Sequence, residues 1–568
     1  MSEGNAPPGA HRADVPSDSD GGVDSGVLAS SAVMAAGTLV SRLSGFVRSA
    51  LLAAALGLGL HADIFTIANT IPNMLYILLA GGVFNAVLVP QLVRAMRSDD
   101  DGGEAYTNRV MTLAALFLGA VTIALVLLAP QVMSLYLDSR YDDPDRAEHL
   151  ASAIAFARYC LPQVFFYGMF VLVGQILNSR GRFGPMMWAP IANNVIAVAT
   201  LVIYLVMFGP ADAAEQVGPF SGRQELLLGL GSTLGIAAQL IILVPYLKRA
   251  GFTFRPRLDF RGVGLGHTMR LGVWTVLFVI VNQIAYTVVV RLASGGVADG
   301  GDGTGYSVYS ATFLIVMVPH SIITVSLATA ILPRLSRRAA DGDLQGLAAS
   351  LTSSLRAALA VVVPFAALLP LVATDMANVI WGHGAAAEKF GFYAPSLALF
   401  GPGLVMFTVH YLMLRGFYSL ELTRTVFFIQ CGVALTNIVG ALVLVGGASK
   451  QETSPALVIA YFTSYAVGAA LSFAVLSSRL GGLDGRRLLR FVVRLVLVAA
   501  GSTAVAAAVA FGLGALWGAQ PHWSLALVRG SVVAGVDLLV FVLLARAFRL
   551  REVTSVIGTV TRKLGVGR

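Results

Sequence analysis

Two arginines lie inside an otherwise apolar stretch near the N-terminus, VSRLSGFVRSALLAAALG, which runs from Val40 to Gly57. Arg42 and Arg48 are six positions apart, which on a helix is about 9 Å along the axis and about 120° around it. A guanidinium is permanently charged and can bind phosphate or carboxylate oxygens through two parallel hydrogen bonds. The spacing suits the wall of a broad polar cavity better than a narrow pore.

The composition indicates where such a helix would lie. Hydrophobic residues make up 57% of the chain and charged residues only 12%, about half the share of a soluble protein, and the mean hydropathy is +0.78. Apolar stretches of 20 or more residues recur, as helices that span a hydrocarbon core of about 30 Å require. The short alternating segments of a membrane β-barrel are not seen. The sequence therefore predicts an all-α integral membrane protein.

About fourteen transmembrane helices are predicted, with short connections that leave no room for a soluble domain. The spans lie near 27–56, 62–93, 108–136, 148–178, 185–208, 225–247, 264–294, 306–333, 346–374, 387–418, 425–446, 454–478, 489–516 and 523–547. We divide the chain into a polar disordered cytoplasmic tail (1–26), two six-helix lobes (27–250 and 251–480), two further helices (481–550) and a basic cytoplasmic tail (551–568).

The net charge of +9 is spread over short loops, which suits orientation signals better than nucleic-acid binding. Loops that follow the even-numbered spans are rich in Lys and Arg, as in residues 248–261. The opposite loops carry few basic residues, namely Arg140, Arg146, Arg223, Lys389 and Lys450. This asymmetry predicts a multi-pass protein of the cytoplasmic membrane with both termini in the cytoplasm.

A weak internal repeat relates the second and eighth spans. Residues 72–97 and 319–338 both combine a proline, small residues, a Pro-x-Leu exit and basic residues. The period of six spans predicts two pseudo-symmetric lobes around a central cavity, which is a transporter architecture. The residues expected to bend or gate the helices are Pro72, Gly81, Gly82, Pro90 and Pro319.

Five arginines fall within the predicted spans, and each costs about 2.5–3.5 kcal/mol at a helix centre. They should therefore face the bundle interior or water. For Arg158, Arg291 and Arg529 we favour structural roles. Asp63 opens the second span and could pair with Arg48, whereas Arg42 has no acidic residue at a comparable depth in the first two spans. Arg42 is thus the stronger ligand-binding candidate.

Sequence signals of catalysis are absent, so we predict that the chain is not an enzyme. It contains no nucleophile elbow and no metal-spaced cluster, and GGDGTG at 300–305 lacks the GK[ST] ending of a phosphate loop. We predict no cofactor. Coupling to the membrane potential or to a cation stays open, with no cation site identified.

The stretch from Ser41 to Leu92 closely resembles the MurJ/MviN family, the lipid II flippases of peptidoglycan synthesis. The family pattern in this region is S-R-x-x-G-x-x-R, an Asp about fifteen residues on, P-N, a G-x-[FL] stretch and V-P-x-[LF]. Its elements here are Ser41, Arg42, Gly45, Arg48, Asp63, Pro72, Asn73, Gly82, Phe84, Val89 and Pro90. Similarity continues in GQILNSRGRFGPMMWAPIANNV, VPHSIITVSLATAILPRLSR and GFYSLELTRT, and covers about residues 27–550.

The resemblance implies a fourteen-helix fold of the polysaccharide- and multidrug-exporter superfamily, with a cationic central cavity and a lipid-tail groove formed with the last two helices. The cavity residues of the family carry over at Arg42, Arg48 and Asp63. Two family arginines do not, because Tyr76 and Leu314 stand in their places. Arg291 is a candidate to compensate for them, which completes the predicted diphosphate site.

The function implied is translocation of lipid II to the outer leaflet by alternating access. The partners would be the lipid-linked sugar diphosphate, membrane lipids and, through the basic loops, cell-wall synthesis proteins, but not nucleic acid. The alternatives are a flippase for another polyprenyl-diphosphate oligosaccharide, a drug or cation antiporter, a membrane transferase acting on the same lipid, and a non-transporting scaffold of cell-wall synthesis. An antiporter should bind cations through cavity carboxylates, whereas arginines mark this N-terminal half.

Overall fold

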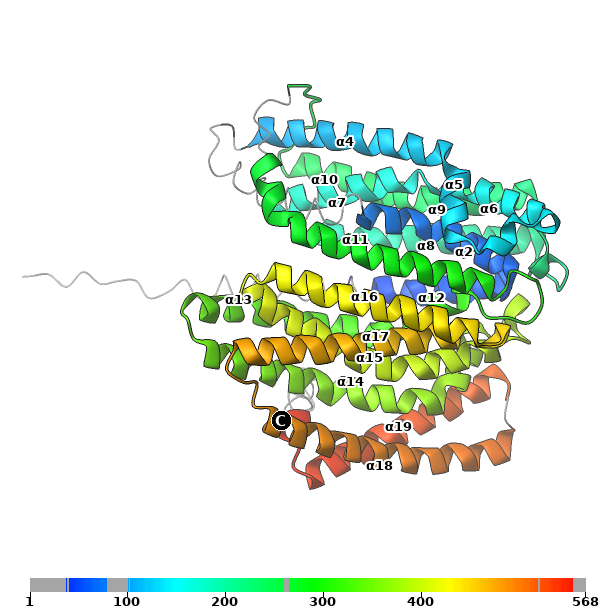
Figure 1. The fold of residues 1–568 in the computed structure, drawn as a ribbon. Coiled ribbons are helices and arrows are strands. Elements are labelled where there is room, and N and C mark those ends of the chain that lie inside the picture. The colour runs from blue at the N-terminus through cyan, green and yellow to red at the C-terminus, as the bar shows by residue number, and fades with distance from the viewer. Residues whose placement is uncertain are drawn as a thin grey trace, which may run out of the picture.

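The computed structural model describes residues 37, 40–78, 101, 103–259, 265–518 and 521–554, and within them the side chains outside 265–272. These residues form a bundle of long, roughly parallel helices (Figure 1). Besides the helix over residues 40–56, the principal helices are α2 (Leu60–Tyr76), α4 (Glu104–Leu127), α5 (Ala129–Tyr136), α6 (Ala147–Cys160), α7 (Gln163–Ser179), α8 (Gly184–Phe208), α9 (Gly222–Ile241), α10 (Leu243–Arg249), α11 (Leu265–Gly295), α12 (Tyr306–Pro319), α13 (Val325–Ala340), α14 (Leu344–Trp381), α15 (Tyr393–Ser419), α16 (Thr423–Gly446), α17 (Thr453–Arg479), α18 (Gly485–Trp517) and α19 (Trp523–Ala547).

Twelve of the helical segments in the described ranges are long and apolar enough to cross a membrane. They coincide one for one with the predicted spans from 108–136 to 523–547. The first two predicted spans are described only in part, as the helix over 40–56 and as α2. The all-helical membrane fold is confirmed, while the count of fourteen stays a prediction.

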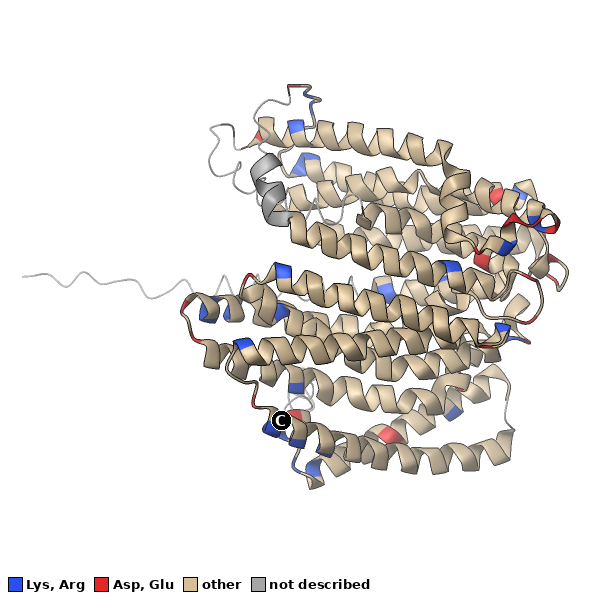
Figure 2. Cartoon of the chain, in the orientation of Figure 1, with Lys and Arg blue, Asp and Glu red and all other residues tan. Residues whose placement is uncertain are grey.

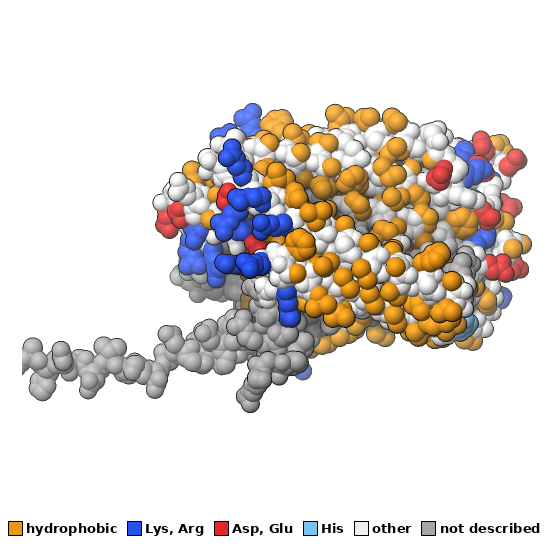
Figure 3. All heavy atoms as spheres, turned by 90° about the horizontal axis from the view of Figure 1, so that it is seen from below, with side chains coloured by type: hydrophobic (Ala, Val, Ile, Leu, Met, Phe, Trp, Pro, Cys, Tyr) orange, Lys and Arg blue, Asp and Glu red, His pale blue; other side chains and the backbone are white. Residues whose placement is uncertain are grey.

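The surface has the distribution of side chains that a membrane requires. Hydrophobic side chains cover the middle of the face shown in Figure 3, and Lys and Arg gather at one end of it. Large apolar side chains such as Phe511, Val206 and Leu127 are 74–82% exposed, which suits contact with lipid rather than water. Because each helix satisfies its backbone hydrogen bonds internally, such a surface can lie in hydrocarbon.

Two groups of helices can be distinguished by packing. The helix over 40–56, α2 and α4 to α10 form the first group, and α11 to α17 form the second. Helices α18 and α19 pack against each other and against α14. We call the end of the bundle where α2 and α12 begin the predicted outer end. Basic side chains are concentrated at the opposite end (Figure 2), as the charge asymmetry of the loops predicts.

The related segments at 72–97 and 319–338 share a local irregularity. Pro72 lies inside α2, and the chain turns to π-helix at residues 77–78. Pro319 ends α12 and is followed by a π-helical turn, His320–Thr324, before α13 begins. A proline removes a helical hydrogen bond, and a π turn accommodates the shift in register. Gly81, Gly82 and Pro90 lie outside the described residues.

A buried ion pair holds α19 on α14. Arg529 donates to the carboxylate of Asp375 at 2.6–3.0 Å and, through Nη1, to the carbonyl of Gly518. The two side chains are only 9% and 6% exposed. The structural role expected for Arg529 is thus realised with Asp375, a residue distant in sequence.

Removing one member of this pair should destabilise the protein. We expect Arg529→Leu to leave a buried carboxylate without its cation and to cost about 3–5 kcal/mol, because a buried charge loses its compensation. The double variant Arg529→Leu/Asp375→Leu should recover most of the loss. Thermal unfolding in detergent measures both, and equal losses in the single and double variants would contradict this account.

Candidate functional site

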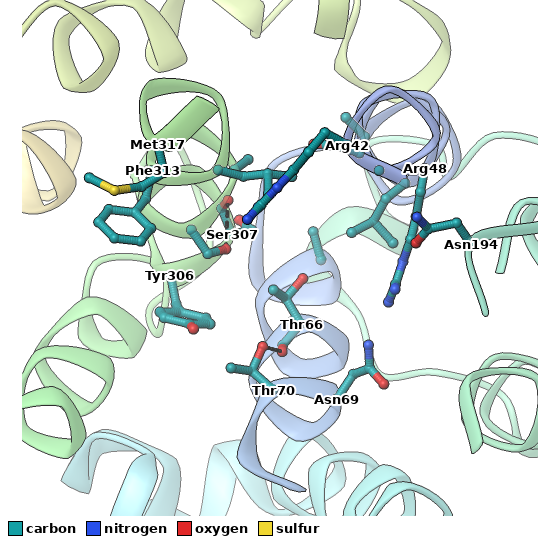
Figure 4. A pocket seen from close by; sticks show the side chains of 18 of the residues that line it. Arg42, Arg48, Thr66, Asn69, Thr70, Asn194, Tyr306, Ser307, Phe313 and Met317 are labelled. Carbon is teal, nitrogen blue, oxygen red and sulfur yellow. Dashed lines mark hydrogen bonds between the residues drawn. The ribbon is translucent and has the colours of Figure 1, made fainter. Parts of the chain in front are cut away.

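A cavity of about 620 Å³ lies between the two groups of helices (Figure 4). One wall is formed by the helix over residues 40–56 with α2 and α8, and the other by α11, α12 and the first residue of α15. Arg42 and Arg48 both line it. The structure therefore brings the two predicted arginines to one cavity, on the wall contributed by the first group.

The two arginines leave their helix in different directions. Arg42 extends across the cavity in the direction of Ser307, while Arg48 runs along the first group toward Asn69 (Figure 4). This divergence is what a separation of about 120° on one helix produces. A ligand held by both side chains must therefore be broad or carry more than one anionic group.

In the part of the chain that the structure describes, no ion pair involves Arg42 or Arg48. Arginine inside a membrane protein is costly and normally faces a partner or a water-filled cavity. Two guanidiniums on one cavity wall, with no carboxylate bound to them, form a site for an anion. A diphosphate offers the negative charge and the oxygen acceptors that guanidiniums bind.

Neighbouring polar side chains fix the helix that carries the arginines. Asn194 on α8 donates from Nδ2 to the carbonyl of Ser41 and to the hydroxyl of Ser44, at 2.9 and 2.8 Å. On α2, Asn69 accepts a hydrogen bond from Gln163 at 3.1 Å. Asn194 thus holds the helix over residues 40–56 against α8 next to Arg42, while the bond between Gln163 and Asn69 joins α7 to α2.

The opposite wall has a different chemistry. Its lining residues are Tyr286, Tyr306, Ser307, Ser310, Ala311, Phe313, Leu314, Met317 and Tyr393. Among the described residues of this wall there is no charged side chain. Leu314 faces the cavity where the resemblance places a family arginine, so the cationic character comes from one side only. Tyr76, the other replacement, is 9% exposed and stacks on Tyr167 in the packing of the first group.

Asp63 links α2 to the start of α12 at the predicted outer end of the bundle. Its carboxylate accepts hydrogen bonds from the backbone N–H groups of Tyr306 and Ser307, at 2.6 and 2.9 Å. These are the first residues of α12, so the negative charge sits at the positive end of a helix. Gly305 permits the approach, because a Cβ there would overlap the carboxylate. Asp63 thus joins the two groups, and the predicted pairing with Arg48 is not what the structure shows.

Ion pairs in the connecting loops also join the two groups of helices. Arg140, in the loop after α5, contacts both Asp138 and Asp299, and Asp299 also contacts Lys450, each at 2.9 Å. The hydrogen bond from Lys450, with the charge of Arg140, holds the pKa of Asp299 below its ordinary value. The ion pair between Arg140 and Asp299 connects the first group to the loop between α11 and α12.

Arg291 lies elsewhere than the sequence predicts. Its Nη1 donates to the carbonyls of Ser134 and Leu135 near the C-terminal end of α5, and it is not among the residues that line the cavity. A cation at the carbonyl end of a helix is favourable because it satisfies free acceptors and the helix dipole. The position corrects the prediction that Arg291 replaces a missing cavity arginine and agrees with a structural role.

Several contacts of the site were not foreseen from the sequence. They are the capping of α12 by Asp63, the hydrogen bonds from Asn194 to the helix over residues 40–56, and the aromatic side chains of the second wall. Only the first left a usable signal, because an isolated acid at the start of one span and a glycine immediately before another can form a helix cap between spans.

A multi-pass helical bundle whose two groups enclose a central cavity lined by arginines and hydroxyl groups has the architecture of a membrane transporter. The family model described as lipid II flippase MurJ matches residues 52–527. The chain belongs to this family. The resemblance drawn from the arginine motif is thereby confirmed.

Relatives agree with this assignment, and solved structures share the fold. The chain is 28% identical to a probable lipid II flippase MurJ of Rhizobium meliloti, over 83% of this chain and 84% of that protein. It is 26% identical to one of Haemophilus influenzae, over 68% and 75%. Its fold matches a lipid II flippase MurJ in an inward closed conformation (TM-score 0.69, 16% identity, 91% and 98% covered). It also matches an inward-facing MATE family transporter (TM-score 0.58, 15% identity, 78% and 95% covered).

The closure at Asp63 can be tested at Gly305. We expect Gly305→Ala to displace the carboxylate and open the predicted outer end, because the added methyl group occupies the position of an Asp63 oxygen. The measurement is labelling of Ser310→Cys by a membrane-impermeant maleimide in intact cells, in a background with Cys160→Ser and Cys431→Ser. Labelling should rise several-fold.

Gly535→Ala is the matched control, since an added Cβ there meets no atom within 4 Å. If Gly305→Ala were labelled no faster than Gly535→Ala, Asp63 would not be holding the outer end closed.

Proposed function

We propose that this protein moves lipid II from the cytoplasmic to the outer leaflet by alternating access of the cavity between its two helix groups. The observation that carries the proposal is the pair of arginines on one cavity wall in a member of the lipid II flippase MurJ family. A polyprenyl diphosphate carries a charged head that cannot cross hydrocarbon unaided and a tail that can stay in the lipid. The two arginines of the cavity supply cationic hydrogen-bond donors for this charged head.

In this proposal the described conformation has its outer end closed and receives the head group from the cytoplasm. Arg42 and Arg48 replace water around the diphosphate with charge-assisted hydrogen bonds. The groups then rock about the cavity, which requires the contacts of Asp63 with α12 and of Arg140 with Asp299 to break. Pro72 and Pro319, each followed by a π-helical turn, lie on two helices that form the facing walls and are the expected bending points.

The energetic scale is consistent with such a cycle. A charge at a helix N-terminus contributes about 0.3–2 kcal/mol, and hydrogen bonds to a charged group about 1.5–3 kcal/mol. The closure is thus worth a few kcal/mol, which differential binding of a ligand to the two states can overcome. We further propose the membrane potential as a driving force, because an inside-negative potential favours outward movement of an anion by about 2.3 kcal/mol per charge per 100 mV.

Leu314 favours one alternative function. The chain would then be a related flippase for another polyprenyl-diphosphate oligosaccharide. A cavity with arginines on one wall alone still binds a diphosphate, but its second wall selects what the diphosphate carries.

In cells that depend on this chain, depletion should make lipid II inaccessible at the outer face. Unchanged access would exclude lipid II as the substrate.

Arg42→Ala should abolish this flipping while the protein still inserts into the membrane. The loss of hydrogen bonds from a charged donor, about 1.5–3 kcal/mol, weakens diphosphate binding roughly 10- to 100-fold. The measurement is outer-face accessibility of lipid II in depleted cells that express the variant. Arg291→Gln is the control, because that arginine binds α5 carbonyls outside the cavity and should support normal flipping. Normal flipping by well-expressed Arg42→Ala would refute the proposal.

A further inference from the structure

The cavity wall contributed by the second group presents aromatic rings backed by more aromatic rings. Phe313 and Tyr286 are half-buried and line the cavity. Behind Phe313, the rings of Tyr309, Phe400 and Tyr461 lie at centroid distances of 6.4, 5.6 and 5.8 Å. The Tyr309 ring is nearly parallel to that of Phe313, and the other two meet it edge-on. Phe313 is therefore held in place by its surroundings.

Tyr286 is fixed in a similar way. Its hydroxyl lies 2.7 Å from the hydroxyl of Tyr306, a cavity-lining residue of α12 that Asp63 binds through the backbone. Ser310, one helical turn before Leu314 on α12, adds a hydroxyl to the same wall. The wall thus combines rigid aromatic faces with hydroxyl groups and, in its described residues, no charge.

This combination does not suit a diphosphate, which needs cations or many N–H donors. It suits a group with apolar faces and hydroxyl edges. A pyranose ring has that character, because its axial C–H bonds form an apolar face that packs on an aromatic ring, while its hydroxyls form hydrogen bonds around the rim. Binding pockets of this kind orient a ligand with a few polar groups on a mainly apolar and aromatic lining.

We propose that Phe313, Tyr286 and Ser310 form a saccharide subsite that binds the first sugar of the head group, across the cavity from the arginines that bind its diphosphate. The inference rests on the proposed function and adds that the two walls of the cavity bind different parts of the head group. Diphosphate is bound by the first group of helices and sugar by the second. The second wall then distinguishes lipid-linked saccharides from bare polyprenyl diphosphates.

The test compares two ligands on purified protein in lipid nanodiscs, lipid II and undecaprenyl diphosphate, which share the lipid and the diphosphate. Phe313→Leu keeps the site apolar but removes the ring, and should weaken lipid II binding roughly tenfold while changing undecaprenyl diphosphate binding less than about twofold. Ser310→Ala should weaken lipid II binding about two- to tenfold. Phe428→Leu is the matched control, since that ring lies on α16 outside the cavity and is 54% exposed.

The outcomes separate this inference from the proposed function. If Phe313→Leu weakens both ligands equally, the ring contacts the lipid or the diphosphate, and the saccharide subsite is excluded. If neither Phe313→Leu nor Ser310→Ala affects lipid II, the wall serves packing alone and the inference fails, while flipping through Arg42 still stands. If the unaltered protein binds neither ligand, the proposed function itself fails. Should Phe313→Leu not fold, judged by its thermal unfolding, Ser310→Ala decides the question alone.

Discussion

The constraint on which the site depends is the cost of a charge inside a membrane protein. The charge of Arg529 is compensated by Asp375 in a buried ion pair, and the charge of Asp63 is compensated by the N-terminus of α12. Arg42 and Arg48 have no such partner in the described residues and line a cavity instead. The charges of Arg529 and Asp63 are thus compensated within the protein, whereas the two arginines on the cavity wall are available to an anionic ligand.

The use of a helix end to bind Asp63 has a consequence for the whole mechanism. If Asp63 were paired with Arg48, one cavity cation would be neutralised and the first two helices would be held to each other. Binding of Asp63 to α12 instead leaves Arg48 available and joins the two groups of helices. One carboxylate therefore joins the two groups at the predicted outer end without neutralising a cavity arginine.

The sequence predicted the all-helical membrane fold, and it singled out Arg42 and Arg48, which line the cavity. Apolar length predicted each of the twelve long helices, and the arginine motif identified Arg42, Arg48 and the family. The errors concern partners distant in sequence. Arg291 appeared available because its acceptors are backbone carbonyls of α5, which no residue pattern reveals. The partner of Asp63 was also missed, although the acid and the glycine before α12 left a signal, because a helix N-terminus provides charge without a charged side chain.

The one-sided distribution of charge also bears on how a head group could cross. When two walls separate, a ligand follows the wall that binds it more tightly. Charge-assisted hydrogen bonds are roughly twice as strong as neutral ones, so the diphosphate should stay with the helix over residues 40–56 throughout the movement. The neutral wall of α11 and α12 can then release its part of the ligand first. Because Leu314 stands where the resemblance places an arginine, no charged side chain among the described residues of the second wall would hold the diphosphate as the two walls separate.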